Sequence, residues 1–222
     1  MTSLNSNSRA IQQSLGLSSD VIYSTGYELL EKLKVHGSIL DFGSGQGRFL
    51  SMLFNLGFEK MSGADLMEAP SQLPSLCRWV QTDLNNQLPL ADESFDVIVA
   101  IEVIEHLENP RAMIRELKRL LRPGGYIILS TPNNESVRAI FSLMMKGHFV
   151  SFLEKNYPAH ITALTSLDIK RIFIENNFSE IKFIYINKGL IPGLRGVTWQ
   201  NLSLGVLKGK RFSDNIFAIA RK

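Results

Sequence analysis

Short apolar runs alternate with helical patterns along most of this chain of 222 residues. Each run has the length and composition of a strand buried on both faces, and several are followed by apolar residues at helical spacing. Because parallel strands need a crossover connection, the alternation favours an α/β fold with a mostly parallel sheet, doubly wound by helices on both faces. The seven runs are residues 38–42, 61–64, 78–81, 95–100, 126–130, 181–186 and 216–220.

Three helices have readable boundaries. One covers about residues 19–33, ahead of the first strand. Another begins at Pro110 with Asn109 as N-cap and ends at the Arg-Pro-Gly-Gly of residues 122–125. A third begins at Thr165 or Ser166 and ends near Asn176. The apolar segment 137–153 is left open as core, a lid over a site, or an interfacial helix.

Length, cysteine content and hydropathy limit the classes of protein. A chain of 222 residues suits one domain with a substantial core. The single cysteine, Cys77, permits neither an internal disulfide nor a thiolate metal cage, which fits a reducing compartment. No uninterrupted apolar run approaches the roughly 20 residues of a membrane span. We therefore expect a cytoplasmic protein whose chemistry comes from other side chains.

The strongest local signal is Asp41-Phe42-Gly43-Ser44-Gly45-Gln46-Gly47, which links the first strand to an apolar helix. Glycines there let the backbone turn sharply and let a ligand approach the start of the helix without a Cβ in the way. The nicotinamide fingerprint needs a small third residue, and that position holds Arg48. The spacing indicates a nucleotide-like ligand and argues against a dehydrogenase.

Four motifs in order give this chain a family resemblance. The glycine loop is followed by Asp65 at the end of the next strand, by Asp83-Leu84 after the third, and by residues 88–98 and 121–125 leading into the fourth and fifth. Together they resemble the class I S-adenosylmethionine-dependent methyltransferases. The resemblance implies a Rossmann-like, seven-stranded sheet whose last strand is antiparallel. It divides one methyltransferase domain, 1–222, into a helical extension (1–36), a cofactor-binding core (37–131) and an acceptor-side, basic part (132–222).

The same resemblance implies a seat for S-adenosylmethionine. Asp65 would accept hydrogen bonds from both ribose hydroxyls, and Asp83 would meet the adenine amino group. Asp41 would fix the loop and the amino end of the cofactor. The glycine loop would line the methionine and ribose, and apolar side chains would contact the rest. The full implied set is Asp41, Gly43, Ser44, Gly45, Gly47, Asp65, Leu66, Asp83, Leu84 and Ile101.

An acid, acid and imidazole follow the fourth strand as Glu102, Glu105 and His106. In a helical turn these residues would share one face. His106 could then act as general base, oriented by a glutamate. The cluster resembles those of two methyltransferase branches, the ubiquinone-biosynthesis O-methyltransferases and the 2′-O-methyltransferases of small-RNA ends. That resemblance implies a divalent cation such as Mg²⁺, held by Glu102, Glu105, His106 and His160, as an alternative to a metal-free base.

The acceptor is the least constrained part of the prediction. Residues 182–222 hold eight lysines and arginines against Asp214 alone, a net charge of +7 within a chain of net charge +3. This basic part is either a solvated face or a wall toward an anionic acceptor or acidic lipid. Its aromatic residues occupy packing positions, which makes nucleic acid the less favoured partner. We expect O-methylation of a small or lipid-linked acceptor, with peripheral membrane contact through segments 137–153 and 189–196. The alternatives are an RNA ribose 2′-O-methyltransferase and a catalytically silent binding module.

Overall fold

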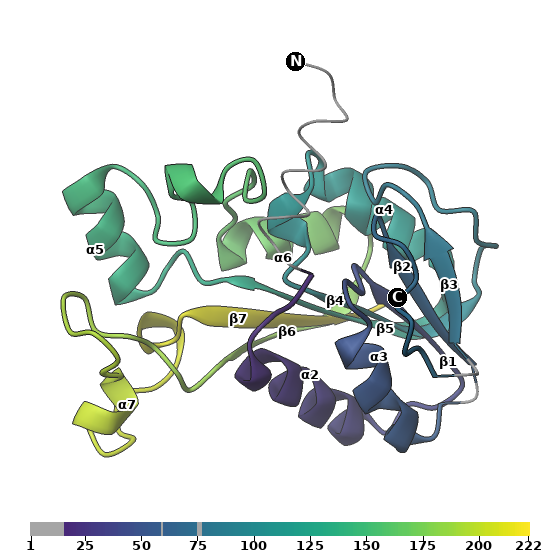
Figure 1. Ribbon diagram of the computed structural model, residues 1–222, viewed down its shortest axis with the longest axis horizontal. Coiled ribbons are helices and arrows are strands. Elements are labelled where there is room, and N and C mark those ends of the chain that lie inside the picture. Colours follow the sequence, from purple (N-terminus) through teal and green to yellow (C-terminus); the bar gives the residue numbers. More distant parts are fainter. Residues whose placement is uncertain (1–15, 59, 75–76) are drawn as a thin grey trace.

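One seven-stranded sheet organises the chain (Figure 1). The computed structural model describes residues 16–58, 60–74 and 77–222. The sheet order is β3-β2-β1-β4-β5-β7-β6, and β7 runs antiparallel to both of its neighbours. The seven predicted strands and the antiparallel last strand are therefore confirmed. The strands are β1 (Ser38–Phe42), β2 (Lys60–Asp65), β3 (Cys77–Gln81), β4 (Phe95–Ile101), β5 (Leu121–Pro132), β6 (Ser179–Tyr185) and β7 (Asn215–Arg221).

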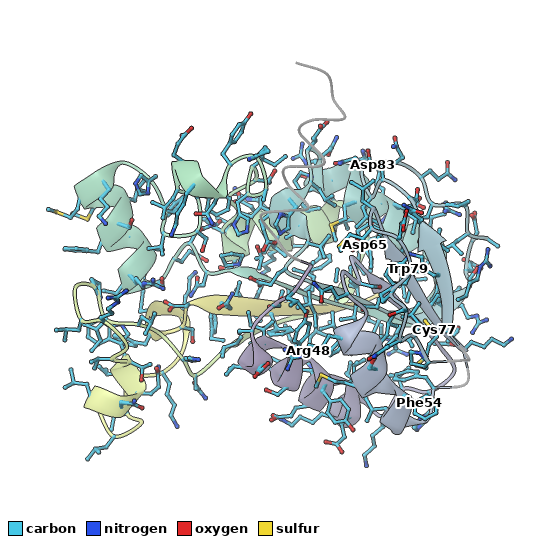
Figure 2. All side chains as sticks on the ribbon, in the orientation of Figure 1. Arg48, Phe54, Asp65, Cys77, Trp79 and Asp83 are labelled. Atoms are coloured by element: carbon cyan, nitrogen blue, oxygen red, sulfur yellow. The ribbon has the colours of Figure 1, made fainter. Side chains whose placement is uncertain are left out.

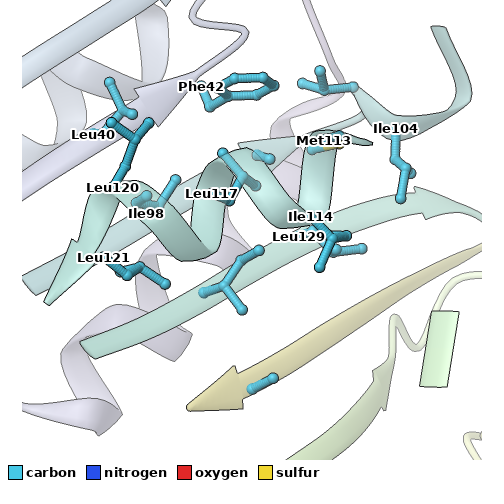
Figure 3. Close-up of a cluster of buried hydrophobic side chains, with 14 of the residues drawn as sticks. Leu40, Phe42, Ile98, Ile104, Met113, Ile114, Leu117, Leu120, Leu121 and Leu129 are labelled. Atoms are coloured by element: carbon cyan, nitrogen blue, oxygen red, sulfur yellow. The ribbon is translucent and has the colours of Figure 1, made fainter. Parts of the chain in front are cut away.

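Helices cover both faces of the sheet. Helices α2 (Asp20–Leu33) and α3 (Arg48–Leu53) lie on one face, and α4 (Pro110–Leu120) and α6 (Ser166–Glu175) lie on the other (Figure 1). Each face has its own cluster of buried apolar side chains, as expected of a sheet wound on both sides. In the cluster of Figure 3, Leu117 and Leu120 of α4 lie beside Ile98 of β4, and Ile114 lies beside Leu129 of β5.

Helix caps explain where two of these helices begin. The Asn109 side chain accepts a hydrogen bond from the amide of Ala112, and Pro110 occupies the first helical position. At α6, Thr165 and Asp168 form a reciprocal capping box. Both predicted starts are confirmed, so capping by nearby side chains determines where α4 and α6 begin.

The connections hold the main departures from regularity. Residues 66–74, which include Pro70 and Pro74, contain no helix, in line with the irregular crossover that the two prolines suggest. Segment 137–153 is helical only as α5 (Val137–Lys146), because Gly147 ends the helix with φ 77°. Helix α7 (Trp199–Leu202), between β6 and β7, has no counterpart in the prediction. Residues 1–15 of the expected N-terminal extension lie outside the described residues.

Within the described ranges, each helix is too short or too polar to cross a membrane.

Candidate functional site

A cavity of about 520 Å³ lies at the carboxyl ends of β1, β2 and β4. This volume is within the ~300–1,000 Å³ range of small-molecule sites, and the position is where open α/β sheets bind ligands. Seven of the ten residues predicted to bind cofactor line it, namely Gly43, Gly45, Asp65, Leu66, Asp83, Leu84 and Ile101. Asp41, Ser44 and Gly47 do not line it.

Close packing explains two glycines of the loop. Gly43 has φ 84°, and a Cβ there would collide with the side chain of Val103. Gly45 has φ 50°, and a Cβ there would collide with the carbonyl of Gly16. The loop is therefore pressed between the start of the chain's described part and the turn after β4, with its backbone facing the cavity.

Two aspartates, labelled in Figure 2, line the cavity: Asp65 is the last residue of β2, and Asp83 lies two residues after β3. Asp65 accepts hydrogen bonds from the amides of Gly45 (2.7 Å) and Met67 (2.9 Å), one at each carboxylate oxygen. Asp83 accepts two from Asn85, from its amide (2.9 Å) and its side-chain nitrogen (3.0 Å). Because each carboxylate oxygen has two lone pairs, both groups keep acceptor capacity toward the cavity.

Asp41 lies behind the loop and away from the cavity. Its side chain is 2% exposed, and one carboxylate oxygen has no hydrogen-bond partner among the described residues. Burial, assisted by the nearby Asp65 charge, raises the pKa of Asp41 to about 7. This position suits support of the glycine loop from behind, and the contact of Asp41 with the amino end of the cofactor stays a prediction.

The Asp41→Asn variant should be the more stable protein at neutral pH. Between pH 4 and 7 the folded protein keeps a proton on Asp41 that the unfolded chain has released, so stability falls as pH rises through this window. A shift from 3.8 to about 7 corresponds to roughly 4 kcal/mol. Urea unfolding at pH 4.5 and pH 8 should show a smaller change in the free energy of unfolding for the variant than for the wild type. An unchanged dependence would contradict this assignment.

A segment before the first strand closes one side of the cavity, a role that the sequence analysis missed. Residues 16–19 line the cavity, and the carbonyl of Gly16 accepts a hydrogen bond from the amide of Gln46 in the glycine loop. The amide of Ser18 donates to the hydroxyl of Tyr23 (2.9 Å), and the Arg48 guanidinium lies over the Tyr23 ring. The one sequence signal for this contact is the glycine at position 45, where a Cβ would meet the carbonyl of Gly16.

Glu102 lies in the cavity wall in a left-handed conformation, with φ 54°. Its carboxylate accepts hydrogen bonds from the hydroxyl of Ser130 and from the side-chain amide of Asn215, each 3.1 Å long. Loss of solvation raises the pKa of Glu102 to about 7. Asn215, at the start of β7, also lines the cavity, and no sequence signal pointed to it.

Glu105 does not line the cavity, and the helical turn that would place Glu102, Glu105 and His106 on one face is not formed. Only Ile104–His106 form a turn, of the 3-10 type, and Glu102 lies outside it in its left-handed conformation. Glu105 is fully buried and accepts a hydrogen bond from Thr131 (3.1 Å) with one oxygen, while the other has no partner among the described residues. Burial, with the Glu102 charge nearby, raises the pKa of Glu105.

His106 and His160 meet at the cavity wall. The Nδ1 of His106 lies 2.8 Å from the carbonyl of Ala159, which favours the tautomer with the proton on Nδ1, and the ring also has a hydrogen bond to the backbone of Glu102. The two rings are perpendicular with centroids 4.7 Å apart, and the buried Nδ1 of His160 has no partner among the described residues. Burial lowers the pKa of His106 and lowers that of His160 to about 4.

Three of the four predicted metal ligands come together. Ligand atoms of Glu105, His106 and His160 lie within 4.8 Å of one another. Glu102 is not part of this group, because its carboxylate is engaged by Ser130 and Asn215. One carboxylate and two imidazoles are ligands that suit a divalent cation. Among the described residues, Oε1 of Glu105 and Nδ1 of His160 have no hydrogen-bond partner, so both atoms could bind a cation.

Comparison with known proteins identifies the family. The methyltransferase domain family matches residues 22–182, almost three quarters of the chain. The chain belongs to the methyltransferase domain family. It is an S-adenosylmethionine-dependent methyltransferase. The ubiquinone biosynthesis O-methyltransferase of Rickettsia typhi is 27% identical to this methyltransferase over 189 residues, which cover 78% of this chain and 73% of that protein. Its counterpart in Pseudomonas syringae is 30% identical over 128 residues, about half of each chain.

Solved structures agree with this fold. A SAM-dependent methyltransferase from Archaeoglobus fulgidus has a TM-score of 0.66 at 19% identity, covering 92% of this chain and 95% of that one. A SAM-dependent methyltransferase from Thermotoga maritima, described as a possible histamine N-methyltransferase, has the same TM-score at 18% identity. The match covers 99% of this chain and 96% of that one. At these identities the likeness concerns the fold, and the acceptor must be argued from the site.

Proposed function

We propose that this methyltransferase transfers the methyl group of S-adenosylmethionine to a hydroxyl oxygen of a small or lipid-linked acceptor. The observation that carries the proposal is the orientation of His106. The ring lines the cavity that Asp65 and Asp83 also line, and its Nδ1 faces the carbonyl of Ala159, which favours the neutral tautomer with the proton on Nδ1. A general base and a nucleoside seat in one cavity suit methylation at a hydroxyl.

The proposed binding site for the cofactor lies at the carboxyl edge of the sheet. Asp65 would accept from the ribose hydroxyls, since it lines the cavity and one of its oxygens lies at the glycine loop, on the amide of Gly45. Asp83, with Leu84 and Leu66, is positioned for the adenine end. The backbone of Gly43 and Gly45 would run along the ribose and methionine. S-adenosylmethionine would supply a methyl group on a sulfonium, which an oxygen nucleophile can take in line with the thioether as the leaving group.

His106 handles the proton of the acceptor. With S-adenosylmethionine bound at Asp65 and Asp83 as methyl donor, His106 would take the proton that the acceptor hydroxyl loses. Burial lowers the pKa of His106, so the imidazole is neutral and ready to accept at neutral pH. Glu102, tied to Ser130 and Asn215, forms the adjacent wall and orients the acceptor.

A divalent cation is the second candidate for activating the hydroxyl. It is favoured by the two unpartnered buried atoms, Oε1 of Glu105 and Nδ1 of His160, which lie in one group with His106. A cation held there would lower the pKa of an acceptor hydroxyl. In that case His106 serves as a ligand, and the same three side chains are needed for activity. Glu102 would remain outside the ligand set.

The lining of the cavity and the names of the relatives favour an apolar acceptor with a hydroxyl group. Part of the cavity wall is apolar, which suits an apolar acceptor better than a charged one. The apolar side chains are those of Leu17, Ile22, Val103 and Leu107. The relatives in Rickettsia typhi and Pseudomonas syringae carry the name ubiquinone biosynthesis O-methyltransferase. We therefore infer a phenolic hydroxyl, on a molecule with or without a lipid tail, as the acceptor.

An RNA acceptor is less favoured, because the aromatic residues of the basic part are engaged in packing. Trp199 and Phe212 pack edge to face with centroids 5.5 Å apart, and Phe217 is fully buried. A single strand needs exposed aromatic surfaces on which bases can stack.

The proposal is tested by offering acceptors of different chemistry under identical conditions. A catechol, the same catechol with an isoprenoid tail, histamine and a short RNA with a free 3′ end should be incubated with S-adenosylmethionine. Mass spectrometry and NMR should show methylation at a phenolic oxygen, and the tailed catechol should be preferred or equal. Preferred methylation of histamine or of the RNA end would contradict the proposal.

A further inference from the structure

The chain between β6 and β7 leaves the sheet at the edge that holds the cavity. Because β7 is antiparallel to β5 and β6, the end of β6 and the start of β7 both lie where β1 and β4 end. Asn215, the first residue of β7, lines the cavity itself. We name residues 186–214 the β6–β7 excursion. It projects beyond the sheet at the left of Figure 1 and contains α7.

The tip of the β6–β7 excursion presents aliphatic side chains to solvent. Leu202 is 64% exposed, Leu204 94% and Val206 79%. Leu204 and Gly205 both have positive φ, so the chain turns sharply there and directs these side chains outward. Three exposed aliphatic residues within five positions of one turn are unusual for a surface that faces only water.

Hydrogen bonds hold this tip in its outward form. The side-chain amide of Gln200 donates to the carbonyls of Leu207 (2.9 Å) and Phe212 (2.8 Å), and its oxygen accepts from the amide of Gly189 (3.0 Å). The amide of Leu207 donates to the hydroxyl of Ser203 (2.9 Å). The aliphatic side chains are thus displayed by an ordered scaffold, which keeps them from folding back onto the protein.

Helix α5 adds a second apolar projection at the same end of the molecule (Figure 1). Its outer face carries Phe141, Leu143, Met144 and Met145, of which Met144 is 78% exposed. Helix α5 follows β5 and therefore also leaves the carboxyl edge of the sheet. Helix α5 and the β6–β7 excursion lie on either side of the paired strands β6 and β7, where these strands reach the carboxyl edge of the sheet (Figure 1).

Cations accompany the apolar side chains. Lys208 and Arg195 are exposed in the excursion, and Lys146 ends α5. In the part of the chain that the structure describes, none of these three enters an ion pair. Exposed aliphatic groups flanked by unneutralised cations match the headgroup region of a membrane with anionic lipid.

We propose that the tip of the β6–β7 excursion, residues 202–208, docks on an anionic lipid bilayer together with α5, inserting Leu204 and Val206 among the headgroups. A projecting turn fits this partner better than a protein surface, since stable protein interfaces bury about 800 Å² per partner on broad, complementary faces. Insertion there brings the edge that holds the cavity close to the lipid. The inference concerns docking alone and does not require the proposed acceptor.

Vesicle co-sedimentation tests the docking. The protein should bind vesicles of phosphatidylcholine with 25% phosphatidylglycerol more tightly than pure phosphatidylcholine vesicles. Leu204→Ser with Val206→Ser should weaken this binding about tenfold or more, and Lys208→Glu should weaken it further at low salt. The matched control is Leu167→Ser with Ile174→Ser on α6, side chains that are 50% and 54% exposed outside the tip and α5. The control pair should bind like the wild type.

Two results would overturn the docking. One is wild-type protein that stays in the supernatant with both kinds of vesicle, and the other is a tip variant that binds as well as the wild type. A concentration-dependent dimer that the tip substitutions abolish would reassign the surface to a second copy of the chain. A thermal shift with S-adenosylhomocysteine verifies that each variant is folded, and because vesicle binding needs no methyl transfer, its failure leaves the proposed function untouched.

Discussion

Asp65→Ala should weaken the binding of S-adenosylhomocysteine at least about 100-fold. The alanine variant loses the acceptor for the ribose hydroxyls and also the hydrogen bonds to the amides of Gly45 and Met67 that shape the loop. Hydrogen bonds to charged groups contribute ~1.5–3 kcal/mol each, so the loss of two gives this factor or more. Isothermal titration with S-adenosylhomocysteine measures the effect directly.

Two further variants make the Asp65 result specific. Asp65→Asn keeps the size of the side chain but turns one oxygen into a donor that faces an amide, so it should also bind weakly. Asp92→Ala removes an exposed aspartate that does not line the cavity, and its affinity should equal that of the wild type. Wild-type affinity in both Asp65 variants would exclude the ribose role.

His106→Gln should lower kcat by ~10²–10⁴ while leaving the affinity for S-adenosylhomocysteine near the wild-type value. Glutamine can retain a hydrogen bond to the carbonyl of Ala159 but cannot take a proton from the acceptor. The chemical step therefore suffers, whereas the nucleoside seat at Asp65 and Asp83 remains. Single-turnover rates and titration on the same preparations separate the two effects.

His148→Gln is the matched control for this variant, since His148 does not line the cavity. Its kcat should equal that of the wild type. If His106→Gln turned over at the wild-type rate with a phenolic acceptor, the base would have to be sought elsewhere in the wall.

Chelation decides between the two ways of activating the hydroxyl. If His106 acts alone, EDTA leaves the rate unchanged and His160→Gln has a small effect. If a cation is held, EDTA removes activity, Mg²⁺ restores it, and His160→Gln and Glu105→Gln both lower cation affinity in a titration that involves no turnover. The unpartnered atoms of Glu105 and His160 make this comparison informative.

Local chemistry explains why the framework could be predicted from the sequence. The strands are continuous apolar runs because both faces of the sheet are covered, and the helix starts carry their own caps at Asn109 and Thr165. Asp65 lies at the end of β2 and Asp83 just past the end of β3, and both line the cavity, because parallel strands end at one edge. These features depend on residues close together in the sequence.

The parts that sequence reasoning missed depend on contacts between distant segments. The left-handed Glu102 is held by Ser130 and Asn215 from two other strands, and Glu105 is drawn toward Thr131 on β5. The closure of the cavity by residues 16–19 uses the backbone of Gly16, which leaves no side-chain signature. The outward turn at Leu204 likewise depends on hydrogen bonds across the excursion.

A crystal structure of this methyltransferase with S-adenosylhomocysteine would show where the nucleoside binds. We expect the ribose hydroxyls within hydrogen-bond distance of Asp65, the adenine beside Asp83 and Leu84, and the sulfur facing the wall formed by Glu102 and His106. A nucleoside bound outside this cavity, or a sulfur directed away from His106, would contradict this expectation.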